Sequence, residues 1–385
     1  MCKDTNFLLK LVMISTFFFN FAHKYIKKMP QIPELKEYEF RLSKAITWLR
    51  FPLIFLIIML HCYSVQRLEG DYAIYFKVLY PFSLWLGETG VPGFFFISGY
   101  LFFLSRKTYP QKIKSRINTL IIPYLLWNCL YLLLYLVLYA FGHPLDINRR
   151  NLADYYFTDY LRLFWDRGDF DHGNFVPLLC PMWYIRNLFI LSLLSPLLYN
   201  LIKYIRELFL LVTIIWWLFT NHNAFIPQTV FFFSLGAYFS ILGINPLEII
   251  SKRKIWFLIL FAFFGMGDIL THTNIETPIG LHVHRLALTF NIPILLLLAD
   301  HRVIKASGTR IQFLANSSFI VFCVHYPIVL ILRKLCVTFF KGGTNETHIL
   351  LYFICVIIVT LMSLGLYCIL DKYFPKTKNI LSGNR

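Results

Sequence analysis

Two ionisable side chains, Arg50 and His61, lie within one apolar stretch that runs from Ala45 to Val65. The stretch is long enough to cross a bilayer, which takes about 20 apolar residues in a helix. A charged residue inside such a span costs about 2.5–3.5 kcal/mol on insertion scales, so two in one span need an explanation. Histidine titrates near neutral pH and can take a proton from a hydroxyl, whereas arginine stays charged and suits phosphate through its planar fork.

The spacing of these two residues places both side chains on one face of the expected helix. Eleven residues at about 100° each come within about 20° of three full turns, and they separate the two groups by about 16 Å along the axis. One stripe of the helix would therefore carry a fixed cation near one membrane surface and a titratable base nearer the other. The alternative is structural: Arg50 reaches the lipid headgroups with its long side chain, and His61 hydrogen-bonds a neighbouring helix.

The second apolar stretch, Val78–Leu104, contains the motif GETGVPGFFFISGYL. Its glycines and proline interrupt a helix and leave room for another helix or a ligand close to the backbone. Glu88, just before this break, is either a group that binds an acceptor or relays a proton, or a solvated carboxylate. Ser98 and Tyr100 lie in the same motif as candidates that support a site, but Ser98 is not part of a G-x-S-x-G nucleophile elbow.

Other candidates lie further along the chain. Trp183 fits the aromatic belt at a membrane surface, whereas Arg186 lies inside a span and lacks that explanation. His325 is a second histidine in an apolar stretch and can equally be a hydrogen-bond donor between helices. His282 and His284 have no evident third ligand, so we expect no metal site.

A basic loop, Arg106–Arg116, follows the second apolar stretch and carries Lys112, Lys114 and Arg116. Such loops can simply orient a membrane protein. Beside a span with a buried arginine, this loop also suits a phosphate-rich ligand in the cytosol.

The composition excludes an ordinary soluble domain. Of the 385 residues, 58% are hydrophobic and 18% aromatic, and the mean hydropathy is +0.61. We expect an all-α, polytopic membrane protein with about ten transmembrane helices. The formal net charge of +17 fits lysine and arginine gathered on the cytoplasmic side, not nucleic-acid binding. Because an even number of spans returns the chain to the same side, both termini are expected in the cytoplasm.

The expected spans divide the chain into three parts. Residues 1–44 form an N-terminal extension and cytoplasmic lead-in, residues 45–371 the transmembrane domain, and residues 372–385 a cytoplasmic tail. One interpretation of residues 1–28 is that they are not translated and that the protein starts at Met29. The ten spans are about Ala45–Val65, Val78–Leu104, Ile117–Phe141, Met182–Leu201, Glu207–Thr220, Phe225–Ile244, Ile255–Leu270, Leu281–Ala299, Phe313–Leu332 and His348–Leu370.

Several motifs, in their order along the chain, resemble the acyltransferase 3 family of membrane-bound enzymes that modify sugars. They are Arg50-x10-His61, GVPGFFFISGYL (Gly90–Leu101), a basic loop ending in Pro123-Tyr124, the Trp-Tyr-Ile-Arg run that includes Trp183, and SSFIVFCVHYPI (Ser317–Ile328). The resemblance covers the chain from about Lys44 to Asp371. The basic loop reads KIKSRINTL here, without the dense double-arginine run of the family.

The resemblance implies transfer of an acyl group, usually acetyl, from acyl-CoA to a hydroxyl of a saccharide or lipid-linked glycan in the bacterial inner membrane. Acyl-CoA would be a substrate, with no permanently bound cofactor. The implied roles are His61 as the catalytic histidine with Arg50 as its partner, Arg116 with Lys112 and Lys114 as contacts to CoA, and His325 as the C-terminal histidine of the family. The alternative is a transporter or flippase of glycan intermediates, because broken helices and buried charges also mark transport paths.

Overall fold

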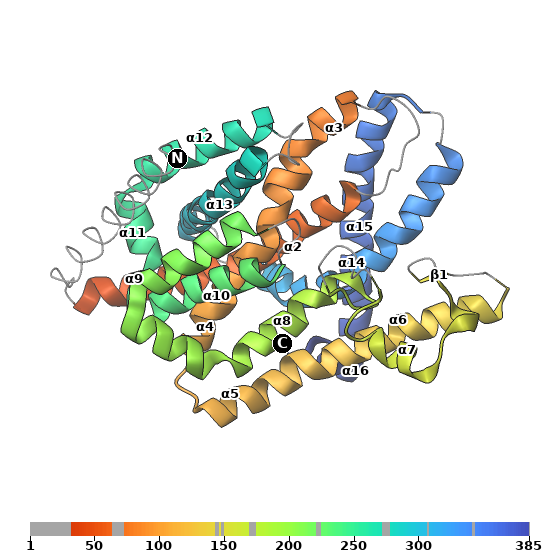
Figure 1. Ribbon diagram of the computed structural model, residues 1–385, viewed down its shortest axis with the longest axis horizontal. Helices are drawn as coiled ribbons and strands as arrows, with labels where there is room; N and C mark the ends of the chain where they lie inside the picture. The colour runs from red at the N-terminus through yellow and green to blue at the C-terminus, as the bar shows by residue number, and fades with distance from the viewer. Residues whose placement is uncertain are drawn as a thin grey trace, which may run out of the picture.

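The chain folds into a bundle of helices, shown in Figure 1 as a computed structural model that describes residues 32–63, 73–142, 146–147, 150–168, 175–220, 225–271, 278–305, 308–340 and 343–384. Six helices of the described part are long and apolar enough to cross a membrane, or eight if each of two bent pairs counts as one span. The all-α polytopic class is thus confirmed. The count of ten spans is not confirmed among the described residues, and the cytoplasmic placement of both termini stays a prediction.

The first expected span belongs to α2 (Ile32–Tyr63), one unbroken helix that begins well before Ala45 and continues past Pro52. In Figure 1 it runs through the middle of the bundle. It packs against α4, α13, α14 and α15, which are introduced below. The interpretation of residues 1–28 as untranslated lies outside the described residues.

The second apolar stretch is helical throughout, but in four pieces. These are α3 (Ala73–Tyr80), the π-helical turn η1 (Pro81–Leu86), the 3-10 turn η2 (Gly87–Thr89) and α4 (Gly90–Leu104). The irregular turns therefore precede the GVPG motif, and the motif itself starts a regular helix.

The basic segment Arg106–Arg116 is helical from Tyr109 on, so the expectation of a loop was wrong for all but its first three residues. α5 (Tyr109–Arg116), the π-helical turn η3 (Ile117–Ile121) and α6 (Ile122–Ala140) run on as one helix of 32 residues, Tyr109–Ala140. Its start is fixed by a capping box between Thr108 and Gln111, and Pro110 suits the first turn. The charged residues are therefore held on a rigid element that continues into the membrane span.

The chain bends sharply at two places between apolar helices. α8 (Trp183–Leu193) and α9 (Ser195–Phe219) meet at 66°, and α10 (Phe225–Ile241) and α11 (Pro246–Lys252) at 94°. A proline lies in the first turn of both α9 and α11, where it lacks the N–H needed to extend the preceding helix. The expected span Met182–Leu201 therefore crosses the first bend, whereas the expected span Phe225–Ile244 ends before the second.

The last four expected spans lie within α12 (Lys254–Thr271), α13 (Pro278–Lys305), α14 (Thr309–Phe339) and α15 (Asn345–Tyr373). The tail forms a further helix, α16 (Pro375–Ser382). The Trp127 indole N–H of α6 donates to the Leu381 carbonyl at 3.0 Å, so the tail packs on the bundle.

Between α6 and α8 the chain forms a lobe of described residues 146–147, 150–168 and 175–182, at the right of Figure 1. It contains a two-residue hairpin of β1 (Asp146–Ile147) and β2 (Arg150–Asn151), the turn η4 (Leu152–Asp154), α7 (Phe157–Arg162) and the turn η6 (Cys180–Met182). The Tyr124 hydroxyl of α6 donates to the Phe164 carbonyl, and the Asn128 side chain accepts from the Leu179 N–H at 3.1 Å. The lobe is thereby fixed to a membrane helix.

Two glycines bring α4 and α10 into backbone contact. A Cβ on Gly99 would lie 2.0 Å from the Phe233 carbonyl oxygen, and one on Gly236 2.0 Å from that of Phe96. Of the two uses expected for the small residues of the FISGY motif, the structure shows the approach of a helix.

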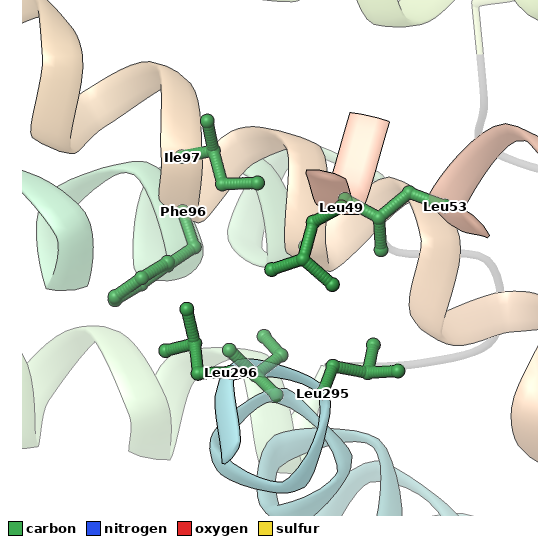
Figure 2. A pocket seen from close by; sticks show the side chains of 8 residues that line it. Leu49, Leu53, Phe96, Ile97, Leu295 and Leu296 are labelled. Carbon is green, nitrogen blue, oxygen red and sulfur yellow. The ribbon is translucent and has the colours of Figure 1, made fainter. Parts of the chain in front are cut away.

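A small gap of about 10 Å³ lies between α2, α4 and α13. Figure 2 shows it lined by Leu49, Leu53, Phe96, Ile97, Leu295 and Leu296. A gap of this size and lining offers a water molecule too little room and no polar partner, so it belongs to the packing of the core.

Candidate active site

The contact between α2 and α14 brings together the two histidines that the sequence singled out. The ring of His61 lies 5.2 Å from that of His325 and 5.2 Å from that of Tyr326, measured between centroids. His325 is 0% exposed, whereas His61 is half-buried. Of these two residues, His61 is therefore the more exposed.

The tautomer of His325 follows from its hydrogen bonds. Its Nδ1 lies 2.7 Å from the Phe322 carbonyl oxygen and 3.3 Å from that of Val321. Because a carbonyl only accepts, Nδ1 carries the proton of the neutral ring and Nε2 keeps a lone pair. The buried Nε2 has no hydrogen-bond partner in the described part of the chain. These bonds stay within α14, so the expected alternative of a donor between helices does not describe His325.

Tyr326 connects the histidines to the lobe. Arg167 and Cys180 of the lobe are polar neighbours of its hydroxyl. Neither Tyr326 nor Arg167 was a candidate from the sequence. The only available signal was the position of Tyr326 next to His325.

A second chain of contacts runs from the histidines towards the basic helix. The Tyr184 ring packs on Phe322, with centroids 5.8 Å apart, and Phe322 lies 6.0 Å from His325. The hydroxyls of Tyr184 and Ser98 are hydrogen-bonded at 3.1 Å, and Tyr184 is an electrostatic neighbour of Arg116. Ser98 thus lies at the edge of the site.

The three basic candidates separate into a pair and a single residue. Lys112 and Arg116, four residues apart, both lie over the Phe102 ring of α4, at 5.0 and 5.4 Å from its centroid. Lys114 lies on the opposite side of α5 and is exposed. The structure therefore brings Lys112 and Arg116 together and leaves Lys114 apart from them.

Arg50 is half-buried on α2. The helix is unbroken between Arg50 and His61, so it keeps the regular spacing from which we expected both residues on one face. In the described part of the chain Arg50 makes no hydrogen bond or ion pair, which leaves its five N–H donors available to a ligand.

Glu88 belongs to a charged cluster that the sequence did not reveal. Its Oε2 lies 3.0 Å from Nε2 of His284, whose Nδ1 lies 3.0 Å from Oδ2 of Asp268. The Tyr80 hydroxyl donates to Oδ1 of Asp268 at 2.8 Å. Glu88 is therefore ion-paired, not simply solvated. His282 has a different neighbour, the Phe219 ring at 4.7 Å, so the two histidines do not act as a pair.

The remaining candidates have structural partners. Trp183 is buried and stacks on Phe225 with centroids 4.0 Å apart, so the interpretation as a surface belt was wrong. Tyr100 is buried in the core. Arg186 donates to the carbonyls of Trp165 and Phe175 and lies 4.6 Å from the Trp165 ring centroid. It satisfies irregular backbone of the lobe where that backbone lies against membrane helices.

Comparison with known proteins assigns the chain to a family. The sequence profile described as "Acyltransferase domain" matches residues 43–368. The succinoglycan biosynthesis protein ExoH of Rhizobium meliloti (strain 1021) is 25% identical over 363 residues, which cover 89% of this chain and 92% of that protein. No solved structure matches the chain. The chain, with its paired histidines on α2 and α14, belongs to the acyltransferase domain family.

Proposed function

We propose that this protein transfers an acyl group, in the first instance acetyl, from acyl-CoA to a hydroxyl of a saccharide, with His61 as the general base. The observation that carries the proposal is the contact of half-buried His61 with buried His325 in a chain of an acyltransferase family. The saccharide acceptor is supported by the relative that is named for succinoglycan biosynthesis. We place the protein in the bacterial inner membrane, with both termini in the cytoplasm.

The two histidines have different roles in this proposal. His61 accepts the proton of the attacking hydroxyl as its oxygen forms a bond to the thioester carbonyl carbon. The carbon–sulfur bond then breaks, and the proton on His61 passes to the leaving thiolate, so that CoA leaves as a thiol. His325 acts as a residue that positions His61. Its Nδ1 proton is held by backbone carbonyls of α14, so its Nε2 keeps a lone pair that can accept a hydrogen bond.

The donor binds from the cytosol with its phosphates near the start of α5. Lys112 and Arg116 lie together there over Phe102, and we propose this pair as the main phosphate contact, with Lys114 at the margin. Arg50, which has no partner in the described residues, is a further cation for the same ligand. The contacts through Tyr184 suggest the direction in which the acyl end points, towards His325 and His61.

Transfer is favoured over transport. The family of the chain is named for acyl transfer, and a histidine that can accept a proton suits that reaction. A flippase would release no CoA, so measuring the release of CoA from acetyl-CoA distinguishes the two functions.

The test uses the full chain reconstituted in lipid nanodiscs with acetyl-CoA and a de-O-acetylated saccharide from the organism that produces the protein. We expect His61→Ala to lower the rate of acetyl transfer by about 10²–10⁴, the usual contribution of a general base. His282→Ala is the matched control, because His282 is another half-buried histidine but packs on Phe219. A His61→Ala variant that folds and transfers acetyl at the wild-type rate would contradict the proposal, as would wild-type protein that forms no ester.

A further inference from the structure

The lobe contains a hollow that has no role in the proposed steps of acyl transfer. Its walls are formed by Ile147, Arg150, Tyr155, Asp159, Arg162, Leu163, Asp166, Arg167 and Gly168. The wall thus combines guanidinium donors, carboxylate acceptors and one aromatic ring. Sites for polyhydroxylated ligands need donors and acceptors together, because each hydroxyl of a sugar both donates and accepts.

The charges around the hollow are largely paired. Arg150 lies 2.9 Å from Asp159 and 4.8 Å from the Tyr155 ring centroid, and Arg162 lies 3.1 Å from Asp166. The backbone N–H of Tyr156 and the Arg150 guanidinium hold the pKa of the Asp159 carboxyl below its usual value. The carboxylate therefore remains an acceptor at physiological pH. Because Arg150 and Arg162 are paired with carboxylates, the hollow favours a neutral polyol over a strongly anionic ligand.

α7 separates this hollow from a second, apolar surface. Asp159, Arg162 and, beyond the helix end, Asp166 follow one another at three- and four-residue spacing and line the hollow. Phe157, Leu161 and Trp165 follow at four-residue spacing on another side and are 76%, 57% and 50% exposed. Exposed apolar side chains in this pattern are typical of a segment that lies in the headgroup region of a bilayer. The lobe is attached to the membrane helices α6 and α8 by hydrogen bonds.

One residue links the hollow to the proposed active site. Arg167 lines the hollow and is also a polar neighbour of the Tyr326 hydroxyl. The Tyr326 ring is in turn 5.2 Å from that of His61. A ligand in the hollow therefore lies one arginine and one tyrosine away from the general base.

We propose that the hollow binds the saccharide of a lipid-linked acceptor while the apolar side of α7 lies in the lipid headgroups that hold the acceptor's anchor. This inference rests on the proposed function, since it names where the acceptor of that reaction binds. It assigns Asp159 and Arg162 to saccharide binding and Phe157 and Leu161 to contact with lipid.

The first test separates acceptor binding from chemistry. Lipid-linked oligosaccharide from host membranes, de-O-acetylated with mild alkali, is titrated in the transfer assay with nanodisc-embedded protein. We expect the double variant Asp159→Asn/Arg162→Gln to raise the acceptor KM about tenfold, the value of two weakened hydrogen bonds, with kcat and the acetyl-CoA KM unchanged. Arg310→Gln, an exposed arginine in the first turn of α14, is the matched control for loss of a charge.

The second measurement needs no reaction. A fluorescent derivative of the same oligosaccharide is bound to wild type and variants without acyl-CoA, and thermal unfolding checks that each variant folds. Should Asp159→Asn disturb the start of α7, the single variant Arg162→Gln carries the test, because the Arg162 side chain is 60% exposed. Binding that weakens in the variants supports the hollow even if wild type transfers no acetyl, a result that would refute only the proposed function. Transfer with an unchanged acceptor KM and unchanged binding in the variants overturns the hollow and leaves the proposed function intact.

The lipid contact has its own comparison. Phe157→Ser/Leu161→Ser should raise the KM for the lipid-linked acceptor several-fold and leave the KM for the soluble oligosaccharide unchanged, because only the former needs the bilayer. An equal change for both acceptors would overturn the assignment of this side of α7 to lipid.

Discussion

Loss of the His284 imidazole should destabilise the fold by more than a neutral hydrogen bond contributes. Asp268 is 0% exposed, and its two carboxylate oxygens have His284 and the Tyr80 hydroxyl as partners. In His284→Ala one oxygen loses its partner inside the membrane domain. Removing one member of a buried ion pair costs about 3–5 kcal/mol, whereas neutral hydrogen bonds between membrane helices average about 0.6 kcal/mol. The difference is large enough to decide whether this cluster is ionic.

The assay is unfolding in mixed micelles, followed by heat and by denaturant. His284→Ala is compared with His282→Ala, a half-buried histidine two residues away that has no carboxylate partner among the described residues. The double variant Asp268→Asn/His284→Ala removes the lone carboxylate as well, so it should recover about 1–3 kcal/mol of the loss. If His284→Ala costs no more than His282→Ala, or if the double variant is worse than the single one, the reasoning about a buried charge is refuted.

Two further predictions concern packing. Gly99→Ala should cost about 1–3 kcal/mol of stability or abolish folding, because its methyl group would meet the Phe233 carbonyl. Gly365→Ala, whose Cβ would have no atom within 4 Å, should be neutral or slightly stabilising in the same unfolding experiments. Arg186→Lys keeps the charge but loses the fork that holds two lobe carbonyls, so we expect cleavage of the lobe by limited proteolysis to be several-fold faster; a rate equal to wild type would contradict the anchoring role.

The sequence predicted the helical class and the position of most helices, because long apolar stretches leave a membrane protein little choice of backbone. It did not predict the bends. Pro52 and Pro327 lie inside helices that continue past them, whereas the prolines at the starts of α9 and α11 mark angles of 66° and 94°. The two kinds of proline look alike in a sequence. What differs is the packing of neighbouring helices, which only the fold supplies.

The candidate site was predicted in part for a similar reason. His61 and His325 each stood out as an ionisable residue in an apolar stretch, and the structure places their rings in contact. Glu88 also stood out, but its partner His284 is 196 residues away, and no local pattern connects such positions. Arg167 looked like one of many charges in a polar segment, and its link to Tyr326 depends on how the lobe folds back onto α14.

The continuous helix from Tyr109 to Ala140 sets a fixed distance between the basic residues at its start and the lobe. It carries Lys112 and Arg116 near its start and, with Asn128, an anchor of the lobe some 12 residues after Arg116, which is about 18 Å at the rise of an α-helix. This one helix, whose only irregular turn is η3, would then fix the distance between the phosphates of the donor and the lobe that binds the acceptor. Acyl donors would then be selected by the length of the arm between their phosphates and the thioester.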